Sequence, residues 1–501
     1  MATPSVQPPA GSADNVGPGA GRVVARNTLI RMAAQVLAMP LSLVINMVAA
    51  QRLGSEVFGQ FFLAVTFNGF GCLLVDWGLG AVIPAQVARD RSRAGLVLGS
   101  ALAWRLIASP IVGLVLALGC FAMGKSLDFQ IAMALVCLAQ TISLVGRTCG
   151  DVIRGFERAD VGAYLDVGGQ FLTAALVIPT LMLGGGLHAA LVAIVIVSLV
   201  MVVPVWRVLK PLGVGALSAT RAATKTMVRE GTPFLIFGLI LQLQPVIDAV
   251  FLSWYATEQA VGWHAVAKKL VGLLVTPAAA LIGALYPTLC RLHAQDAEAY
   301  RSTSRGAFRA SLAMTAPLAI GCFVFPGLGV SLFSKQSFAP AEDNLRVLAV
   351  YITLVYVTMV MGTILSAAGR QRAWTGVQFL CILVSCIADP LLVRWFQHRT
   401  GNGGIGICVA MVASEILMLA GGFWLMPRGI LDRSVLRSAL LVGGAGAAMV
   451  GTARLLSGIN SFAAAPLAVA VYVGGLYAMG GIEKQQLQVI RSFVARKTSR
   501  R

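Results

Sequence analysis

The sequence predicts an all-α integral membrane protein with about fourteen transmembrane helices. Hydrophobic residues make up 57% of the chain and charged residues only 12%, whereas about a quarter of the residues of a typical soluble domain are charged. The mean hydropathy is +0.82. Apolar stretches of about twenty residues, each long enough to cross a hydrocarbon core of ~30 Å as a helix, recur from residue 29 to residue 482. The strand-like alternation that a membrane barrel requires is absent from the sequence.

Each apolar stretch is expected to form one helix, because in lipid every backbone polar group must bond within its own segment. Polar residues are concentrated in short gaps between the stretches. The predicted spans are 29–50, 60–83, 95–118, 129–149, 163–183, 187–206, 232–255, 263–288, 308–333, 345–367, 373–395, 404–426, 435–457 and 463–482.

An internal repeat predicts two related lobes of six spans each. A shift of 203 residues places Gly59 on Gly262 and aligns GAVIP (80–84) with GALYP (283–287). Both copies run from an outer gap to the inner end of an even-numbered span, so the repeat is parallel, as in two-lobed transporters. Chance matches among abundant small residues are the alternative explanation.

The ends of the chain and the gap between the lobes differ from the spans in composition. Residues 1–21 are rich in Pro, Gly, Ala and Ser and lack an apolar core, which indicates a disordered tail rather than a signal peptide. The predicted organisation is a disordered cytoplasmic tail (1–27), the first lobe with spans one to six (28–206), a cytoplasmic linker (207–231), the second lobe with spans seven to twelve (232–427), spans thirteen and fourteen (428–482) and a basic cytoplasmic tail (483–501).

The distribution of basic residues predicts that both termini are cytoplasmic, because Lys and Arg are retained on that side of a membrane. With the N-terminus inside, and with residues near span ends counted on the adjoining side, the cytoplasmic side carries 29 of the 39 Lys and Arg residues, the outer side carries seven and the interiors of the spans carry three. The net charge of +19 is therefore interpreted as a topology signal and a basic rim facing lipid headgroups. Nucleic acid is not an expected partner.

Several strings in both lobes carry a family resemblance. In the first lobe they are RLGSEVFGQFFLAVTF (52–67), DWGLGAVIP (76–84) and RGFERADVGAYLD (154–166). In the second lobe they are VIDAVFLSWYATEQAVGWHAVAKKL (246–270), LYPTLCRL (285–292) and ILSAAGRQRA (364–373). These strings resemble the Wzx-type polysaccharide and oligosaccharide flippases of the multidrug/oligosaccharidyl-lipid/polysaccharide superfamily, and the resemblance covers most of residues 25–430. Trp263 departs from the family, which more often has Tyr at that position.

The resemblance implies two six-helix lobes around a central cavity that opens alternately to each side, plus two further helices. It also implies transport of an undecaprenyl-diphosphate-linked oligosaccharide from the inner to the outer leaflet of a bacterial cytoplasmic (inner) membrane, for polysaccharide biosynthesis. The expected partners are this substrate, membrane lipids and polysaccharide polymerase or export machinery. The substrate glycan and the coupling ion are left open.

A diphosphate headgroup requires fixed cations in the cavity, although a charge near the centre of a span costs ~2.5–3.5 kcal/mol on the insertion scale. Arg105 is the first candidate, because it lies about ten residues, or ~15 Å, into its span. The alternative is a structural Arg105 that pairs with an acid, Glu415 being the first to consider. Arg31 lies barely a turn into the first span, where snorkelling to the interface is favoured over substrate binding.

Four further charged residues within the spans are candidates for the cavity, whereas Asp76 and Asp389 lie nearer span ends, where solvation is cheap, and are assigned no role. Lys268 and Lys269 are neighbours on one helix and point ~100° apart, so both cannot face one cavity directly. Lys269 is favoured slightly as the cavity-facing residue, because the family often has a basic residue there. Asp248 lies at a similar depth, so an ion pair with one lysine and a coupling or ligand role are equally plausible. Glu415, near the middle of span twelve, is a candidate to carry a coupling proton or to be a neutral hydrogen-bonded acid.

Other functions find less support in the sequence. A cation-coupled multidrug exporter of the same superfamily is the nearest alternative and would require acids in its cavity. A membrane polysaccharide polymerase or glycosyltransferase usually needs a sizeable extramembrane region, and the outer gaps are about ten residues at most. The chain lacks the GxxxxGK[ST] loop, so no nucleotide is expected. Nine scattered cysteines and four histidines without motif spacing predict neither a metal site nor a disulfide framework, and no cofactor is expected. We therefore predict a transporter rather than an enzyme.

Overall fold

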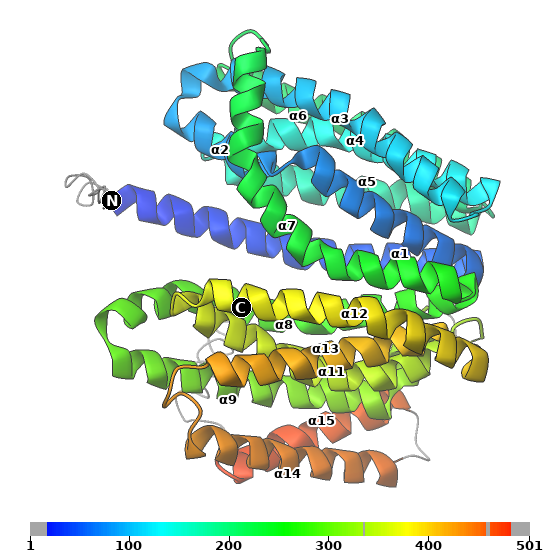
Figure 1. The fold of residues 1–501 in the computed structure, drawn as a ribbon, viewed down its shortest axis with the longest axis vertical. Helices are drawn as coiled ribbons and strands as arrows, with labels where there is room; N and C mark the ends of the chain where they lie inside the picture. Colours follow the sequence, from blue (N-terminus) through cyan, green and yellow to red (C-terminus); the bar gives the residue numbers. More distant parts are fainter. Residues whose placement is uncertain (1–17, 334–335, 457–460, 482–501) are drawn as a thin grey trace, which may run out of the picture. The chain divides into compact units, whose positions relative to one another are not determined.

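The computed structural model describes residues 18–333, 336–456 and 461–481, in which every regular element is a helix (Figure 1). The longer helices are α1 (Pro18–Asp76), α2 (Leu79–Arg89), α3 (Ala94–Ala122), α4 (Leu127–Gly155), α5 (Ala159–Met182), α6 (Leu187–Leu209), α7 (Arg221–Tyr255), α8 (Glu258–Gln295), α9 (Ala297–Val324), α11 (Ala341–Ala367), α12 (Gln371–Thr400), α13 (Gly403–Leu425), α14 (Arg433–Leu455) and α15 (Ser461–Ala478). Three short helices complete the chain, namely η1 (Arg91–Arg93), η2 (Lys210–Leu212) and α10 (Pro326–Ser331).

The predicted all-α membrane class is confirmed. Twelve helices in the described residues are long and apolar enough to cross a membrane, and α7, which is bent between Ile240 and Gln242, raises the number to thirteen. Fourteen spans were expected. The difference arises in α1, because the first two expected spans are joined there and Gly54 interrupts the helix between them with φ 76°. Glycine has no Cβ and adopts this left-handed conformation without steric cost.

The chain divides into two compact units. Unit 1 comprises residues 1–45, 71–118 and 134–236, and unit 2 comprises residues 46–70, 119–133 and 237–501. Two segments predicted for the first lobe, 46–70 and 119–133, therefore pack with unit 2. The segment 1–27, predicted to be a disordered tail, contains the start of α1 at Pro18. The rest of that tail, residues 1–17, and the basic tail 483–501 lie outside the described residues.

Each unit has its own apolar core. In unit 1, Leu79, Ile83, Leu98 and Val152 are fully buried where α2, α3 and α4 meet. In unit 2, α11 and α13 are the most enclosed spans, with 56% of the residues of their most apolar segments buried. The polar side chains that these two helices carry are therefore removed from lipid and face neighbouring helices.

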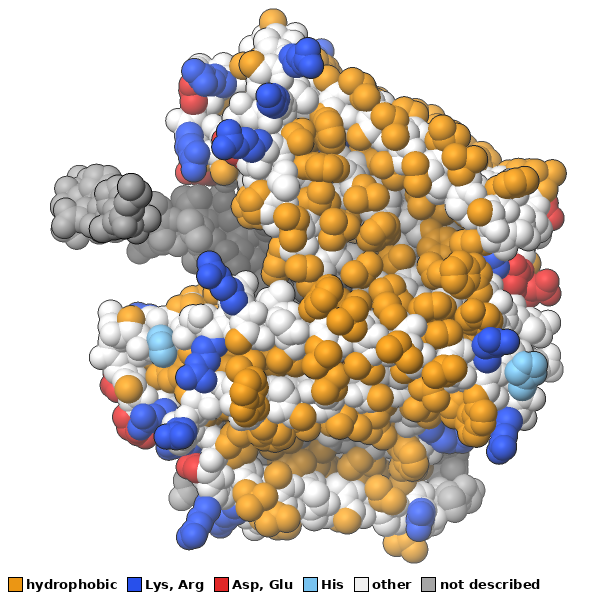
Figure 2. All heavy atoms as spheres, in the orientation of Figure 1, with side chains coloured by type: hydrophobic (Ala, Val, Ile, Leu, Met, Phe, Trp, Pro, Cys, Tyr) orange, Lys and Arg blue, Asp and Glu red, His pale blue; other side chains and the backbone are white. Residues whose placement is uncertain are grey.

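The outer surface of unit 2 is apolar along the middle of its helices. Figure 2 shows hydrophobic side chains over these middle segments, with Lys, Arg, His and acidic side chains gathered toward the helix ends. Large apolar side chains such as Ile387 and Leu440 are about two-thirds exposed. A surface of this kind faces hydrocarbon, because lipid tails are as apolar as the side chains that contact them.

Candidate functional site

The spans of unit 2 enclose a polar cavity of ≈ 200 Å³. Helices α7, α8, α11, α12 and α13 contribute to its lining. Its charged residues are Asp248, Lys268 and Glu415, all three of which were singled out from the sequence. The fold thus brings together side chains that lie up to 167 positions apart in the chain. A polar space of this volume with ionisable walls is suited to small ions and protons rather than to a whole glycolipid.

Lys268 and Asp248 form an ion pair in this cavity. The ammonium Nζ of Lys268 lies 3.7 Å from Oδ2 of Asp248 and 3.7 Å from the sulfur of Met411. The Asp248 side chain is 6% exposed and that of Lys268 is 29% exposed. The sequence left a structural pair and a ligand role equally open. The structure provides the pair and also leaves the ammonium partly accessible.

A second carboxyl group, that of Asp389 on α12, lies close enough to Asp248 for the two groups to interact electrostatically. Asp389 is completely buried, and no donor among the described residues reaches either of its carboxyl oxygens. Two carboxylates repel each other at this range, and a hydrogen bond between them requires a proton on one of them. The sequence assigned Asp389 no role, because it lies near the end of its span.

Glu415 on α13 completes the set of acids. It is 6% exposed, and its Oε2 accepts a hydrogen bond of 2.6 Å from the hydroxyl of Thr358 on α11. Nearby, the hydroxyls of Ser385 and Ser414 lie 3.0 Å apart, and the amide of Gln244 donates to Ser385 at 3.4 Å. The cavity therefore continues into a chain of hydroxyl and amide groups.

Lys269 lies next to Lys268 but points in another direction. Its side chain is exposed, and none of the described acids forms an ion pair with it. This difference between the neighbours agrees with the ~100° turn per residue of a helix. Arg31 lies in α1, in a stretch where the structure describes the backbone alone.

Arg105 lies in unit 1, and its surroundings differ from those of the lysines. Its side chain is 2% exposed. One guanidinium nitrogen donates to the hydroxyl of Thr148 at 2.5 Å. The other forms ion pairs with Asp76 and, at 3.3 Å, with Asp151. Asp151 also pairs with Arg154. Two arginines thus meet two carboxylates, and the cluster carries no surplus positive charge.

This geometry agrees with a structural role for Arg105. Glu415, which the sequence suggested first as its acidic partner, is not that partner. The partners are Asp76 and Asp151, whereas Glu415 lies in unit 2 and bonds to Thr358. An early signal for these partners exists in the sequence, since Asp76 ends a long apolar run just before a Trp-Gly pair.

The Arg105 cluster lies at a break in the backbone. Helix α1 ends at Asp76, and the next two residues adopt positive φ angles, 49° at Trp77 and 72° at Gly78. The indole of Trp104 donates to the carbonyl of Val75 at 3.0 Å, a group that the break leaves near the helix end. Arg105, one residue further along α3, holds the carboxylate of Asp76. The cluster therefore stabilises an interrupted helix.

Comparisons with known proteins agree with the fold. A model of the family described as "Polysaccharide biosynthesis protein" matches residues 24–293, more than half of the chain. The solved structure of the lipid II flippase MurJ, in an inward closed conformation, is similar with a TM-score of 0.69 at 13% identity, over 92% of this chain and 99% of that one. No curated protein matches the chain.

Two further solved structures share the architecture. An inward-facing multidrug resistance MATE family transporter of the MOP superfamily has a TM-score of 0.59 at 16% identity, over 82% of this chain and 98% of that one. A MOP superfamily transporter from Pyrococcus furiosus has a TM-score of 0.55 at 16% identity, over 81% and 94% of the two chains. At these identities the likeness concerns the fold alone.

Proposed function

This chain belongs to the polysaccharide biosynthesis protein family, and from that premise we propose that it is a flippase for a lipid-diphosphate-linked oligosaccharide. It would carry the saccharide unit from the inner to the outer leaflet of a bacterial inner membrane by alternating access. The single observation that carries the proposal is the family match, over a chain whose described part is built of membrane-spanning helices. The resemblance of residues 25–430 to Wzx-type flippases suggests undecaprenyl diphosphate as the carrier lipid.

Lys269 is the residue that we assign to the diphosphate. A phosphate needs a cation that is not already neutralised, and Lys269 is exposed and has no acidic partner among the described residues. Lys268 would assist from the cavity, where it is partly accessible. Arg105, the first candidate from the sequence, is assigned to the stability of unit 1, because two carboxylates already neutralise it together with Arg154.

The cavity of unit 2 is assigned to ion coupling. Asp248, Asp389 and Glu415 provide three carboxyl groups for the one ammonium of Lys268. With all groups ionised, the cluster would carry a surplus of negative charge in a low-dielectric site, which is costly. Binding of protons removes the surplus. We propose a proton as the coupling ion, held between Asp248 and Asp389.

A reciprocal contact in unit 2 supports alternating access. A side chain at Gly59 would collide with the backbone of Glu258 and Gly262, and a side chain at Gly262 would collide with the backbone of Ser55. Ser55 and Glu258 are themselves separated by 203 residues, the offset of the internal repeat. The two repeat copies therefore meet through a symmetric, small-residue crossing of the kind that lets helices approach closely and separate again.

This contact gives a direct test of alternating access. The amide of Gln60 donates to the carboxylate of Glu258, so cysteines at these two positions lie within reach of a short bis-methanethiosulfonate crosslinker in a background without the native cysteines. We expect the crosslinked Gln60→Cys/Glu258→Cys protein to remain folded and to lose transport, with recovery on reduction. Full transport by the quantitatively crosslinked protein would rule out a cycle that opens this contact.

A cation-coupled multidrug exporter is the second candidate function. The observation in its favour is the surplus of acids in the cavity, since carboxylates also bind organic cations. The two functions differ in the charge of the substrate. An exporter would require Asp248 and Glu415 for drug binding and would tolerate the loss of Lys269, whereas the flippase requires Lys269.

The experiment that separates these candidates is a deletion strain analysed by mass spectrometry of its lipid fraction. The flippase predicts that lipid-diphosphate-linked saccharides accumulate and that the parent gene, but not the Lys269→Gln variant, clears them. Unchanged lipid-linked saccharides together with increased sensitivity to cationic drugs would favour the exporter.

A further inference from the structure

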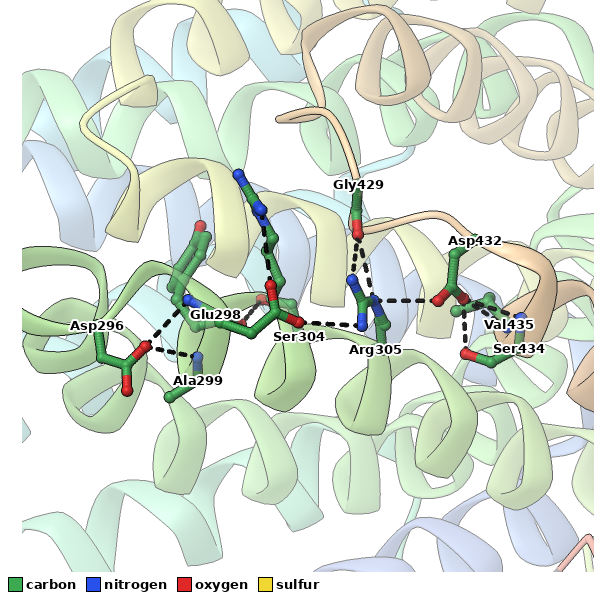
Figure 3. Close-up of polar contacts among 11 residues, drawn as sticks. Asp296, Glu298, Ala299, Ser304, Arg305, Gly429, Asp432, Ser434 and Val435 are labelled. Carbon is green, nitrogen blue, oxygen red and sulfur yellow. Dashed lines mark hydrogen bonds and ion pairs between the residues drawn. The ribbon is translucent and has the colours of Figure 1, made fainter.

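A polar network between α9 and α14 illustrates a structural cluster in unit 2 (Figure 3). The guanidinium of Arg305 on α9 donates to the carbonyl of Gly429 at 2.8 Å and pairs with Asp432 at 3.2 Å. Asp432 in turn accepts from the backbone amides of Ser434 and Val435 at the start of α14. Both charges of the pair are therefore used in joining the two helices.

A side chain in the cavity of unit 2 differs in this respect. Tyr351, on α11, lines the cavity together with Asp248 and Glu415. Its hydroxyl forms no hydrogen bond with the described residues, and it lies close enough to both carboxyl groups to interact with each of them electrostatically. A hydroxyl inside a protein normally has a hydrogen-bond partner. An unbonded hydroxyl beside two acids is therefore a candidate for a functional role.

Glu415 is electrostatically separate from the other charges at the cavity. Its Oε2 accepts a hydrogen bond from Thr358, whereas its Oε1 accepts none from the described residues. Three described charges, those of Asp248, Asp389 and Lys268, have no appreciable effect on it. A proton held by the two aspartates therefore needs a carrier to reach Glu415.

The positions of the two acids along their helices lead to the same conclusion. The end of α7 and the start of α13 lie side by side, because a Cβ on Gly403 would lie 2.8 Å from that of Ala256. Asp248 lies seven residues before the end of α7, and Glu415 lies 12 residues after the start of α13. At 1.5 Å per residue, the two backbone positions differ in depth by roughly 8 Å. Direct proton transfer requires a separation of about 3 Å.

The hydroxyl of Tyr351 has the chemistry of such a carrier, because it can donate and accept a hydrogen bond at once. Among the described residues, each of the five lining helices contributes one titratable side chain to the cavity, namely Asp248, Lys268, Tyr351, Cys381 and Glu415. The ammonium of Lys268 has no lone pair and cannot accept a proton. The thiol of Cys381 already donates to the carbonyl of Ser414 at 3.4 Å.

We propose that the hydroxyl of Tyr351 relays protons between Glu415 and Asp248. In one transfer, protonated Glu415 gives its proton to the phenol oxygen, directly or through one water, while the phenol gives its own proton to the carboxylate of Asp248. Glu415 becomes a carboxylate, Asp248 becomes a neutral acid that can share the proton with Asp389, and the phenol is unchanged. The inference rests on the proposed proton coupling and names the path of that proton.

The test compares Tyr351→Phe with the parent in proteoliposomes. The readout is the flipping rate of a labelled undecaprenyl-diphosphate-linked oligosaccharide under an imposed pH gradient. The rate should fall by about tenfold, less than the ~10²–10⁴ of a lost general acid or base, because water takes over part of the transfer. Water occupies about 30 Å³ per molecule, so the cavity of ≈ 200 Å³ has room for it. Tm and substrate affinity should stay at the parental values, since the hydroxyl has no bond to lose.

The matched control is Tyr356→Phe, on the same helix. The hydroxyl of Tyr356 donates to the carbonyl of Leu274 at 2.7 Å, and Tyr356 does not line the cavity. Its loss should lower Tm and leave the flipping rate within twofold of the parental rate.

A double variant separates a relay from a structural role. Tyr351→Phe/Glu415→Gln should flip no more slowly than Glu415→Gln alone, because the relay then has no proton to carry. Residues that act independently would instead multiply their losses.

Four results would overturn the proposal. Flipping by Tyr351→Phe at the parental rate, with a parent that responds to the pH gradient, contradicts the relay alone. Multiplied losses in the double variant, or a Tm of Tyr351→Phe well below that of the parent, indicate a structural tyrosine. A parent that does not respond to the gradient removes the relay together with the proposed proton coupling.

Discussion

The two units each bury a basic residue among acids, but they do so in different ways. In unit 1, Arg105 is 2% exposed and bonds to Thr148, Asp76 and Asp151. In unit 2, Lys268 is 29% exposed and makes one ion pair, with Asp248. The nearby carboxyl group of Asp389 accepts no hydrogen bond from the described residues. In the first cluster every charged group is ion-paired, although Nε of Arg105 has no hydrogen-bond partner among the described residues. In the second cluster both carboxyl oxygens of Asp389 lack a donor.

This difference distinguishes a structural cluster from a functional one. A buried charge network with every member bonded holds a single conformation, because any change leaves an uncompensated charge. A cluster with unpaired carboxyl oxygens can gain or lose a proton and has a reason to change conformation when it does. The depth of a charged residue in its span does not distinguish a structural cluster from a functional one.

The largest expected effect on folding concerns the Arg105 cluster of unit 1. Arg105→Ala removes the buried cation that pairs with Asp76 and Asp151, although Asp151 keeps its ion pair with Arg154. Breaking a buried pair in this way costs on the order of 3–5 kcal/mol of folding free energy. We expect loss of monodisperse protein in fluorescence-detected size-exclusion chromatography. Asp76→Asn/Asp151→Asn added to Arg105→Ala should restore part of it. A well-folded Arg105→Ala protein that no longer binds lipid diphosphate would return Arg105 to the role first suggested by its sequence position.

The next largest effect, on transport, concerns the acid pair Asp248 and Asp389 of unit 2. Asp389→Asn mimics the protonated acid permanently and supplies a donor toward Asp248, so the protein should fold at least as well as the parent. Transport should fall by on the order of 100-fold, equal to about 2.7 kcal/mol, and should no longer respond to an imposed pH gradient. The matched control is Asp343→Asn, at an exposed residue of α11. Gradient-dependent transport by Asp389→Asn at the parental rate would contradict proton coupling at this pair.

A smaller effect separates the two lysines. Lys269→Gln removes the unpaired cation and should weaken binding of the lipid-diphosphate substrate by about tenfold, the value of one charge-assisted bond. Lys268→Gln should affect the coupling of transport to the pH gradient more than substrate affinity, because its partner is Asp248. Binding is measured by quenching of intrinsic tryptophan fluorescence on the purified proteins. The reverse order of affinities would exchange the two assignments.

The smallest effect concerns Glu415. Thr358→Val removes one neutral donor to this carboxyl, and such a bond contributes about 1 kcal/mol. Transport should fall a few-fold. If Glu415 takes part in coupling, the pH dependence of transport should also shift toward more alkaline values, because the lost donor favoured the ionised carboxylate. A parental pH profile in Thr358→Val, measured beside Thr353→Val on the same helix, would remove Glu415 from the coupling path.

Much of the fold is readable from the sequence, because the hydropathy and the length of each span are local properties. The all-α class and nearly all the spans follow from them. The two spans joined in α1 show the limit, since a single positive φ at Gly54 determines whether one helix or two is counted. The segments 46–70 and 119–133 pack with unit 2 through long-range contacts that apolar periodicity does not encode.

The candidate site was predictable only in part for a similar reason. Hydropathy identifies which charges lie in spans, and three of them, Asp248, Lys268 and Glu415, line one cavity. It does not identify which charges face each other. Asp389 and Asp76 lie near span ends, where solvation of a charge is cheap, so the sequence predicts no role for them. Each nevertheless faces a buried charged partner. Pairing depends on the rotation of neighbouring helices, which the sequence leaves undetermined.

Flipping by the purified chain in proteoliposomes tests the central proposal most directly. The substrate is an undecaprenyl-diphosphate-linked oligosaccharide labelled on its glycan, and the readout is its accessibility to a membrane-impermeant glycan-modifying enzyme under an imposed pH gradient. The account predicts that the parent protein makes the inner-leaflet substrate accessible, whereas Asp389→Asn, reconstituted in equal amount, behaves like protein-free liposomes. Accessibility with the parent protein no greater than in protein-free liposomes, in a preparation that transports an organic cation, would contradict it.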